Sequence, residues 1–202
     1  MSIILVRHGE TPLNVARVLQ PADTPLSATG LAQAAAVAKR LADLRLAGIV
    51  SSDLPRAMST AQAIAAATGL PISTTALLHE RNFGDLRGQS YDTLGFNPLT
   101  MTEAPPGGES AGQFSERVAR AFAHVVALRA ALPGSLAVVT HGLVIRELLA
   151  NHLSSAESMP MKIGNTSVTI VAANAPHGVE LLDCTRHLGD STQHKAGSLS
   201  GG

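Results

Sequence analysis

The chain has 202 residues, 45% of them hydrophobic and 15% charged, with fifteen Lys and Arg against fifteen Asp and Glu. This size and composition fit one folded domain with a sizeable core and exclude a disordered polyelectrolyte. The balanced charge excludes an overall field that would attract nucleic acid or an anionic membrane, so we expect neither as a partner. Aromatic residues make up only 2%, which argues against a base-stacking platform.

The use of cysteine and the start of the sequence favour a cytoplasmic protein. Cys184 is the one cysteine, so we expect no internal disulfide, and no Cys/His spacing matches a structural zinc site. The apolar stretch in "MSIILVRHGE" is short for a signal peptide, and no basic segment precedes it. The other apolar runs are strand-length, well below the roughly 20 residues of a membrane span.

Hydrophobic periodicity in the first half predicts strands that alternate with helices. The expected strands are residues 3–6, 47–53 and 72–75, and the expected helices are residues 29–46 and 54–68. Ser27 is a suitable N-cap for the first helix. Gly69, Leu70 and Pro71 end the second helix. Residues 82–110 lose periodicity and are rich in Gly and Pro, which indicates a short lid.

The second half repeats the alternation. The expected helices are residues 113–132 and 142–153, and the expected strands are residues 135–142, 168–173 and 179–184. Residues 1–184 are therefore predicted to form a single α/β domain, with a mainly parallel sheet between two layers of helices. Residues 185–202 are polar, without periodicity, and predict a loosely held tail.

Two of the strand ends carry histidine followed by glycine, in "LVRHG" and "VVTHG". Ligands of such folds bind beyond the carboxyl ends of the strands, so His8 and His141 are candidate site residues. Glycine lets the backbone approach a ligand, and a following helix offers free amides to an anion. The other histidines except His79 are read as ordinary surface or core residues: His124, His152, His177, His187 and His194.

Arg7 directly precedes His8, and Arg56 follows the second strand in "SSDLPRAMSTA". Two imidazoles with an arginine suit a dianion better than a metal, because Arg7 would repel a cation. Guanidinium groups bind phosphate through paired hydrogen bonds, so both arginines are candidate phosphate clamps. In isolation, Arg56 would be read as a solvated charge at a helix end.

Six motifs together resemble the histidine phosphatase superfamily, in its phosphoglycerate-mutase-like branch. They occur in the family's order between Ile3 and about Val171, and are "LVRHGETPLN", "LSATGLAQA", "SSDLPRAMSTA", "LHERNFGDLRG", "PGGES" and "VVTHGLVIR". A single "RHG" would be weak support, whereas six motifs in order are specific. The resemblance implies the phosphoglycerate mutase-like fold and a phosphohistidine intermediate.

The resemblance also implies roles for individual residues. His8 matches the histidine that attacks phosphorus, and His141 matches a second histidine that would hold a phosphate oxygen as an imidazolium. Arg7 and Arg56 match the phosphate-binding arginines. Asn14 matches a pocket asparagine of the family.

Glu80 matches the family's general acid, which predicts a raised carboxyl pKa. Against this, Glu80 could be an ordinary loop carboxylate whose charged form Arg81 stabilises, with Glu103 and Glu109 as outside candidates for the acid. The backbone amide of Gly142 would complete the phosphate cradle. Two arginines and an imidazolium can neutralise a phosphoryl group without a metal, so we expect no cofactor.

The lid separates two activities within this family. Mutases generally carry a longer insertion that covers the phosphohistidine, and an aromatic residue where this chain has Pro12 and Leu13 before Asn14. The short lid of residues 82–110 therefore favours a metal-independent phosphomonoester hydrolase over a cofactor-dependent phosphoglycerate mutase. The branch with short lids resembles broad-specificity and alpha-ribazole phosphatases.

The motifs say less about the substrate and the oligomeric state than about the catalytic residues. We expect a small phosphorylated metabolite as partner and leave the oligomeric state open, with a homodimer as one arrangement. Four lid residues could line an apolar wall for a larger substrate or simply pack the lid: Tyr91, Phe96, Leu99 and Met101. A non-catalytic adaptor that binds a phosphorylated ligand is the third alternative, disfavoured because degenerate members of the family typically lose the nucleophile or the acid.

Overall fold

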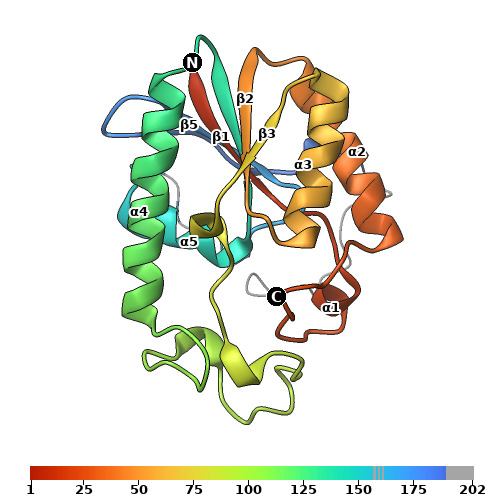
Figure 1. Ribbon diagram of the computed structural model, residues 1–202, viewed down its shortest axis with the longest axis vertical. Helices are drawn as coiled ribbons and strands as arrows, with labels where there is room; N and C mark the ends of the chain where they lie inside the picture. Colours follow the sequence, from red (N-terminus) through yellow and green to blue (C-terminus); the bar gives the residue numbers. More distant parts are fainter. Residues whose placement is uncertain (157, 159, 161, 190–202) are drawn as a thin grey trace.

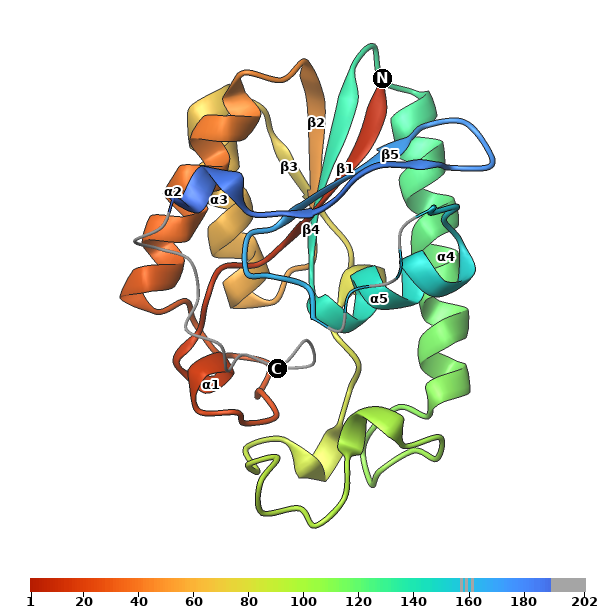
Figure 2. The same cartoon turned by 180° about the vertical axis from the view of Figure 1, so that it is seen from behind.

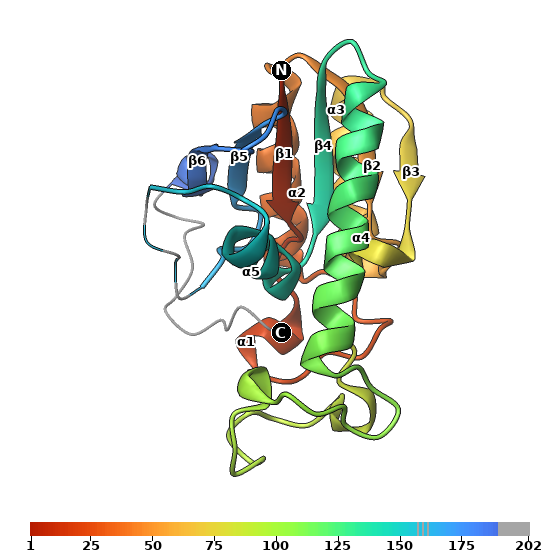
Figure 3. The ribbon, with the colours of Figure 1, turned by 90° about the vertical axis from the view of Figure 1, so that its left-hand side faces the viewer.

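The structure is a computed structural model that describes residues 1–156, 158, 160 and 162–189. Six strands form one sheet in the order β3-β2-β4-β1-β5-β6, which reads across the molecule in Figure 3. The strands are β1 (Ser2–Arg7), β2 (Leu46–Ser51), β3 (Ile72–Thr74), β4 (Ser135–Thr140), β5 (Val168–Ala172) and β6 (Val179–Cys184). β1, β2, β3 and β4 are parallel, and β5 pairs antiparallel with both β1 and β6.

Helices cover both faces of the sheet (Figure 1, Figure 2). The α-helices are α1 (Pro12–Val15), α2 (Ala28–Ala42), α3 (Pro55–Thr68), α4 (Ala111–Ala130) and α5 (Gly142–Asn151). Short 3₁₀ helices are η1 (Ala76–Leu78), η2 (Gly84–Leu86), η3 (Pro98–Thr100) and η4 (Arg186–Leu188). The expected three-layer α/β/α fold with a mainly parallel sheet is confirmed.

Alternate residues of each central strand face opposite layers, as the period of two in a strand requires. Ile3 and Leu5 of β1 pack with the apolar sides of α4 and α5, and Ile4 and Val6 pack with α2 and α3. All four side chains are at most 2% exposed. The strand is therefore apolar from Ile3 to Val6, because both of its faces are covered there.

Two expected boundaries differ from the structure. The helix predicted for residues 29–46 ends at Ala42, since Leu46 already pairs with Ser135 in the sheet. Within the tail predicted from residue 185, Arg186–Leu188 form η4, which packs against α2 and buries Leu188. The remainder of that predicted tail, residues 190–202, lies outside the described residues.

The expected lid, residues 82–110, contains only the 3₁₀ turns η2 and η3 and lies below the carboxyl ends of the strands in Figure 1. It has a small core of its own, in which Phe83 and Tyr91 pack against Leu19 from the segment after α1. Backbone hydrogen bonds join Leu19 to Gln89 and Gly88 at 3.0 and 2.7 Å. These contacts attach the lid to the first loop of the domain.

Candidate active site

The two histidines predicted at strand ends lie together. β1 and β4 pair in parallel with Arg7 opposite Thr140, so the following residues reach the same edge of the sheet. The ring centroids of His8 and His141 are 5.1 Å apart, and both side chains are fully buried. β2 ends beside β4 and adds Ser52 to this edge.

The orientation of the His8 ring assigns its proton. Nδ1 lies 2.7 Å from the carbonyl oxygen of Gly9, which can only accept a hydrogen bond, so Nδ1 carries the proton. Nε2 then holds a lone pair, and it has no hydrogen-bond partner among the described residues. Burial, and next the charges of Arg56 and Arg7, keep the pKa of His8 well below its ordinary value. The ring is therefore neutral near pH 7.

His141 has the opposite arrangement of contacts. Its Nε2 lies 2.9 Å from Ser52 Oγ, while its Nδ1 has no partner within the described part of the chain. Burial, followed by the charges of Arg56 and His8, keeps the pKa of His141 well below its ordinary value. The chain by itself therefore favours a neutral ring at pH 7, which differs from the imidazolium that we expected.

Arg7 and Arg56 are buried, at 1% and 2% exposure, and the charges of both act on the two histidines. The Nη1 group of Arg7 donates to the carbonyl oxygen of Ile163, and the Nη1 group of Arg56 donates to those of Pro21 and Ala22. Burial lowers the pKa of each arginine to about 10, so both remain cationic at pH 7. Two buried cations beside neutral imidazoles form a site suited to an anion.

Asn14 reaches this site through α1, a single turn that is too short for a periodicity signal. Thr11 caps the turn, and its backbone amide donates to Asn14 Oδ1 at 3.1 Å. The Oδ1 atom also accepts from Asn165 Nδ2 at 3.2 Å. The Nδ2 group of Asn14 is buried and has no partner among the described residues, so it is a free donor at the pocket.

Several site residues were not predicted from the sequence. Thr60 Oγ1 accepts from the amide of Gly9, and Gln33 Oε1 accepts from that of Glu10, at 3.1 and 2.8 Å. Asn165 Nδ2 donates to the carbonyl oxygen of His8 at 3.1 Å. These polar residues lie on helices or a loop far along the chain, and no local motif marks them. Together they hold the backbone around His8.

Two of the quoted motifs meet at their glycines. A Cβ atom on Gly30 would lie 2.0 Å from the carbonyl oxygen of Glu10, and one on Gly9 would lie 2.5 Å from that of Gly30. Both distances are far inside van der Waals contact. The first turn of α2 therefore packs directly on the loop that carries His8, which only glycine permits at both positions.

Glu80 lies between η1 and the lid and is buried, at 6% exposure. Its Oε1 accepts from the amide of Arg81 at 3.0 Å, and its Oε2 accepts from that of Leu143 in the first turn of α5 at 3.1 Å. Burial raises the pKa of Glu80 even though these bonds and the charges of Arg56 and Arg7 oppose the change. The raised pKa that we expected is found.

The guanidinium of Arg81 is directed at the lid instead of at the Glu80 carboxyl group. It donates to the carbonyl oxygen of Met101 at 2.8 Å and to that of Glu109 at 3.4 Å. Among the outside candidates for the acid, Glu103 is exposed in the lid. Partial burial acts to raise the pKa of Glu109, but hydrogen bonds from Arg117 and the Asn82 amide lower it overall. Glu109 is therefore held ionised.

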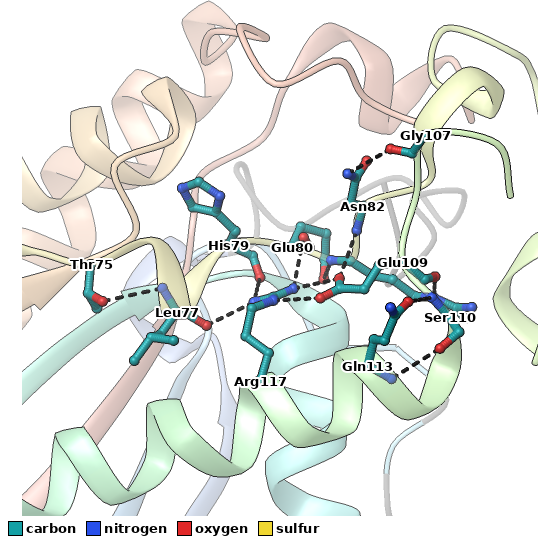
Figure 4. Close-up of polar contacts among 11 residues, drawn as sticks. Thr75, Leu77, His79, Glu80, Asn82, Gly107, Glu109, Ser110, Gln113 and Arg117 are labelled. Carbon is teal, nitrogen blue, oxygen red and sulfur yellow. Dashed lines mark hydrogen bonds and ion pairs between the residues drawn. The ribbon is translucent and has the colours of Figure 1, made fainter. Parts of the chain in front are cut away.

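Arg117 of α4 anchors the segment that carries Glu80 (Figure 4). Its Nη1 group donates to the carbonyl oxygens of Leu77 and His79, both at 2.8 Å, and its Nη2 group donates to that of Glu80 at 3.3 Å. The same guanidinium pairs with both carboxylate oxygens of Glu109, at 2.7 and 2.8 Å. One side chain thus joins α4, the Glu80 segment and the end of the lid.

The remaining residues singled out from the sequence are Gly142 and the four apolar residues of the lid. Gly142 is buried and opens α5 beside His141. Tyr91 packs in the lid core and Phe96 is exposed. Leu99 and Met101 line a cavity of about 380 Å³ with Phe114 and Leu143. The four apolar lid residues therefore do not form one wall.

The other histidines take individual positions outside the His8–His141 pair. His152 and His177 pack against the ring of Phe122, and His187 contacts Arg40. His124 is exposed, and His194 lies outside the described residues.

Two searches of the described residues bear on the class of site. No group of three or more His, Cys, Asp or Glu is arranged to hold a metal ion within the described part of the chain. No helix in residues 1–156 or 162–189 is long and apolar enough to cross a membrane.

Comparisons with known proteins agree with this fold. A model of the histidine phosphatase superfamily, branch 1, matches residues 3–182. Phosphoglycerate mutase-like protein 4 of Arabidopsis thaliana is 37% identical over 182 residues, covering 83% of this chain and 77% of its own. A mycobacterial glucosyl-3-phosphoglycerate phosphatase complexed with VO3 is 32% identical with a TM-score of 0.73, covering 85% and 90% of the two chains.

A further solved structure, a candidate alpha-ribazole-5'-P phosphatase from Escherichia coli, is 25% identical with a TM-score of 0.77 and covers 92% of this chain and 97% of its own. The family match spans both strand-end histidines, both buried arginines and Glu80. By its fold, its motifs and this match, the chain belongs to the histidine phosphatase superfamily.

Proposed function

We propose that this chain is a phosphomonoester hydrolase that needs no metal and acts on a small phosphorylated metabolite through a phosphohistidine at His8. The state of His8 supports this proposal most directly. Its proton is held on Nδ1 by the Gly9 carbonyl, and Nε2 has no partner among the described residues. A neutral imidazole nitrogen is a competent nucleophile, and covalent catalysis divides one hard displacement into two easier steps.

In the first step His8 Nε2 attacks phosphorus, a P–N bond forms and the P–O bond to the leaving alcohol breaks. Glu80 donates its proton to the leaving oxygen, which would otherwise depart as an unstable alkoxide. In the second step Glu80, now a carboxylate, takes a proton from water as the water oxygen attacks phosphorus. The P–N bond breaks, and inorganic phosphate and neutral His8 result.

The buried cations have the role of charge neutralisation. Arg7 and Arg56 would bind the phosphoryl oxygens, and the free Nδ2 group of Asn14 and the Gly142 amide would donate to them. A bound dianion would also raise the pKa of His141 by opposite charge, so that the ring becomes an imidazolium when substrate enters. The neutral ring found in the chain alone is thus compatible with the expected role.

The named relatives support two activities. The Arabidopsis relative carries the name of a mutase-like protein, whereas the two solved structures carry the names of a phosphatase and a candidate phosphatase. The lid of this chain has no long helix and only two 3₁₀ turns. A lid this short would cover a phosphohistidine less completely than a longer one, which supports hydrolysis over return of the phosphoryl group to a bound acid.

The test is an incubation with 4-nitrophenyl phosphate and a panel of phosphorylated metabolites, with and without a chelator. We expect phosphate release at equal rates under both conditions, no isomerisation of 3-phosphoglycerate, and loss of turnover by at least about 10³-fold in His8→Ala. Isomerisation that depends on a bisphosphate primer would establish a mutase instead. A folded protein without turnover on any substrate would support the adaptor alternative.

A further inference from the structure

A second cavity lies next to Glu80. It has a volume of about 680 Å³, is open to solvent, and is bordered by the lid, by α4 and by the loop that precedes α3. Glu80 lines it together with His79, Asn82, Arg87 and Arg117. Figure 4 shows four of the lining residues: Arg117 pairs with Glu109, Asn82 bonds to Glu109 and Gly107, and Gln113 bonds to Ser110.

The position of Glu80 assigns this cavity to the leaving group of the substrate. In the proposed mechanism Glu80 protonates the oxygen that departs from phosphorus. The remainder of the alcohol is bonded to that oxygen, so it must extend past the carboxyl group. The cavity that Glu80 lines is therefore where the alcohol portion of a substrate would lie.

Most charges in the cavity wall are already compensated. Arg117 pairs with Glu109, and His79 pairs with Asp53. Arg120 and Glu116 are both exposed on α4, four residues apart with opposite charges, so they largely offset each other in solvent. Arg87 is the charged lining residue that remains.

Arg87 follows η2 and is half-buried. No hydrogen bond or ion pair joins its guanidinium to any residue in the described ranges. It lies near enough to Arg56 to act on it: burial is the main reason that the pKa of Arg56 falls to about 10, Glu80 opposes this fall, and Arg87 contributes to it. Two neighbouring cations repel each other, and an anion bound close to both would offset that repulsion.

We infer that Arg87 binds a second anionic group, a carboxylate or a phosphate, on the leaving-group side of the substrate. This inference rests on the proposed hydrolase function and deepens it, because it restricts the substrates to phosphomonoesters that carry another negative charge. A guanidinium can bind either group through two parallel hydrogen bonds. Neutral sugar or lipid alcohols would leave Arg87 unpaired in the cavity.

The experiment compares substrates that differ in this group alone. One pair is 3-phosphoglycerate and glycerol 3-phosphate, which differ by a carboxylate against a hydroxymethyl group. The other is fructose 1,6-bisphosphate and fructose 1-phosphate. The wild type is compared with Arg87→Gln and with a control, Arg45→Gln, which removes the same charge from an exposed position before β2, at the opposite end of the sheet.

We expect the wild type to prefer, in at least one pair, the substrate that carries a second anionic group besides the transferred phosphate. Arg87→Gln should lower the ratio of the two kcat/KM values about tenfold, as loss of a charge-assisted hydrogen bond predicts, while Arg45→Gln keeps the ratio. The pair that responds identifies carboxylate or phosphate. Equal losses on both members would place Arg87 on the transferred phosphate, and unchanged ratios in both pairs would also overturn the inference.

A binding measurement separates this inference from the proposed function. Calorimetric titration of His8→Ala with 3-phosphoglycerate, glycerol 3-phosphate and the two fructose phosphates requires no turnover. If 4-nitrophenyl phosphate is hydrolysed but Arg87→Gln binds and hydrolyses all ligands with unaltered preference, the hydrolase stands and the subsite fails. If no substrate is hydrolysed but binding of the second anionic group depends on Arg87, the subsite stands and the hydrolase fails.

Discussion

At the scale of single residues, burial acts in opposite directions on the two groups that exchange protons in the proposed reaction. It lowers the pKa of His8 and raises that of Glu80. In both cases the neutral form is favoured, because a charge loses its hydration in the interior. Burial therefore favours the lone pair on the proposed nucleophile and the proton on the proposed acid, which are the forms that the first step needs.

The role of Glu80 predicts a dependence on the leaving group. Glu80→Gln should slow hydrolysis of alkyl phosphates by about 10²-fold or more, and affect 4-nitrophenyl phosphate much less, because nitrophenolate leaves without a proton. Steady-state kinetics on both substrates measures the difference. Equal losses on the two substrates would point to another acid.

The same carboxyl group should shape the pH profile. Since its pKa is raised, kcat/KM for an alkyl phosphate should fall as pH rises through that pKa and Glu80 loses its proton. This decrease of kcat/KM with rising pH should be absent in Glu80→Gln. If the variant keeps the decrease, the decrease belongs to ionisation of the substrate phosphate instead.

At the scale of elements, the site depends on how α4 holds the loop between η1 and the lid. The carbonyl oxygens of Leu77, His79 and Glu80 have a common donor, Arg117. Glu109, at the end of the lid, is held by the same guanidinium and also accepts from the Asn82 amide at 3.1 Å. The position of Glu80 is therefore set by a helix that contributes no residue to the phosphate site.

Arg117→Met should lower the free energy of unfolding by about 3 kcal/mol, because it leaves Glu109 as a partly buried charge without its partner. Arg120→Met, one turn further along α4 and exposed, should change stability by less than about 0.5 kcal/mol. Denaturant unfolding of both variants measures the difference. A double variant, Arg117→Met with Glu109→Gln, should lose less than the sum of the two single losses. Similar small effects for Arg117 and Arg120 would show that the ion pair does not stabilise the loop.

At the scale of the whole molecule, the fold buries histidines in neutral form, and this makes stability depend on pH. His8 and His141 have folded pKa values well below 6.5, whereas in the unfolded chain they titrate at their ordinary value. Below about pH 6.5 the unfolded state therefore binds more protons than the folded state, and acid favours unfolding. Glu80 acts oppositely, because its raised pKa lets the folded state bind a proton more readily between its folded value and 4.5.

We therefore expect the free energy of unfolding to be highest above pH 6.5 and to fall on acidification towards the folded pKa values. Each of these two histidines contributes about 1.4 kcal/mol per pH unit within that window, and His187, whose pKa is lowered to about 4 chiefly by burial, adds a smaller slope of the same sign because it is only partly buried. Denaturation at a series of pH values measures the slope. Replacing His8 and His141 with Asn should reduce the slope to the smaller one that His187 contributes. A flat profile in the wild type between pH 6.5 and 5 would contradict the buried neutral state.

The sequence by itself determined where the strands and long helices lie along the chain and that they alternate. It also determined the α/β class and the position of His8 and His141 at strand ends. These features depend on local periodicity and on the rule that ligands bind where parallel strands end, so they are readable from neighbouring residues. Arg56 and Glu80 were found through motifs. Short elements such as α1 escaped prediction because four residues carry no period.

Only the tertiary structure decided how the site is held and charged. The free Nε2 of His8 depends on the Gly9 carbonyl, and the raised pKa of Glu80 depends on burial between α5 and the lid. Asn165 and Thr60 reach the His8 loop from positions that are distant in sequence. Whether the Arg87 guanidinium has a hydrogen-bond or ion-pair partner also depends on which residues lie near it in space. Burial and pairing arise from contacts between distant segments, and no local pattern in the sequence encodes them.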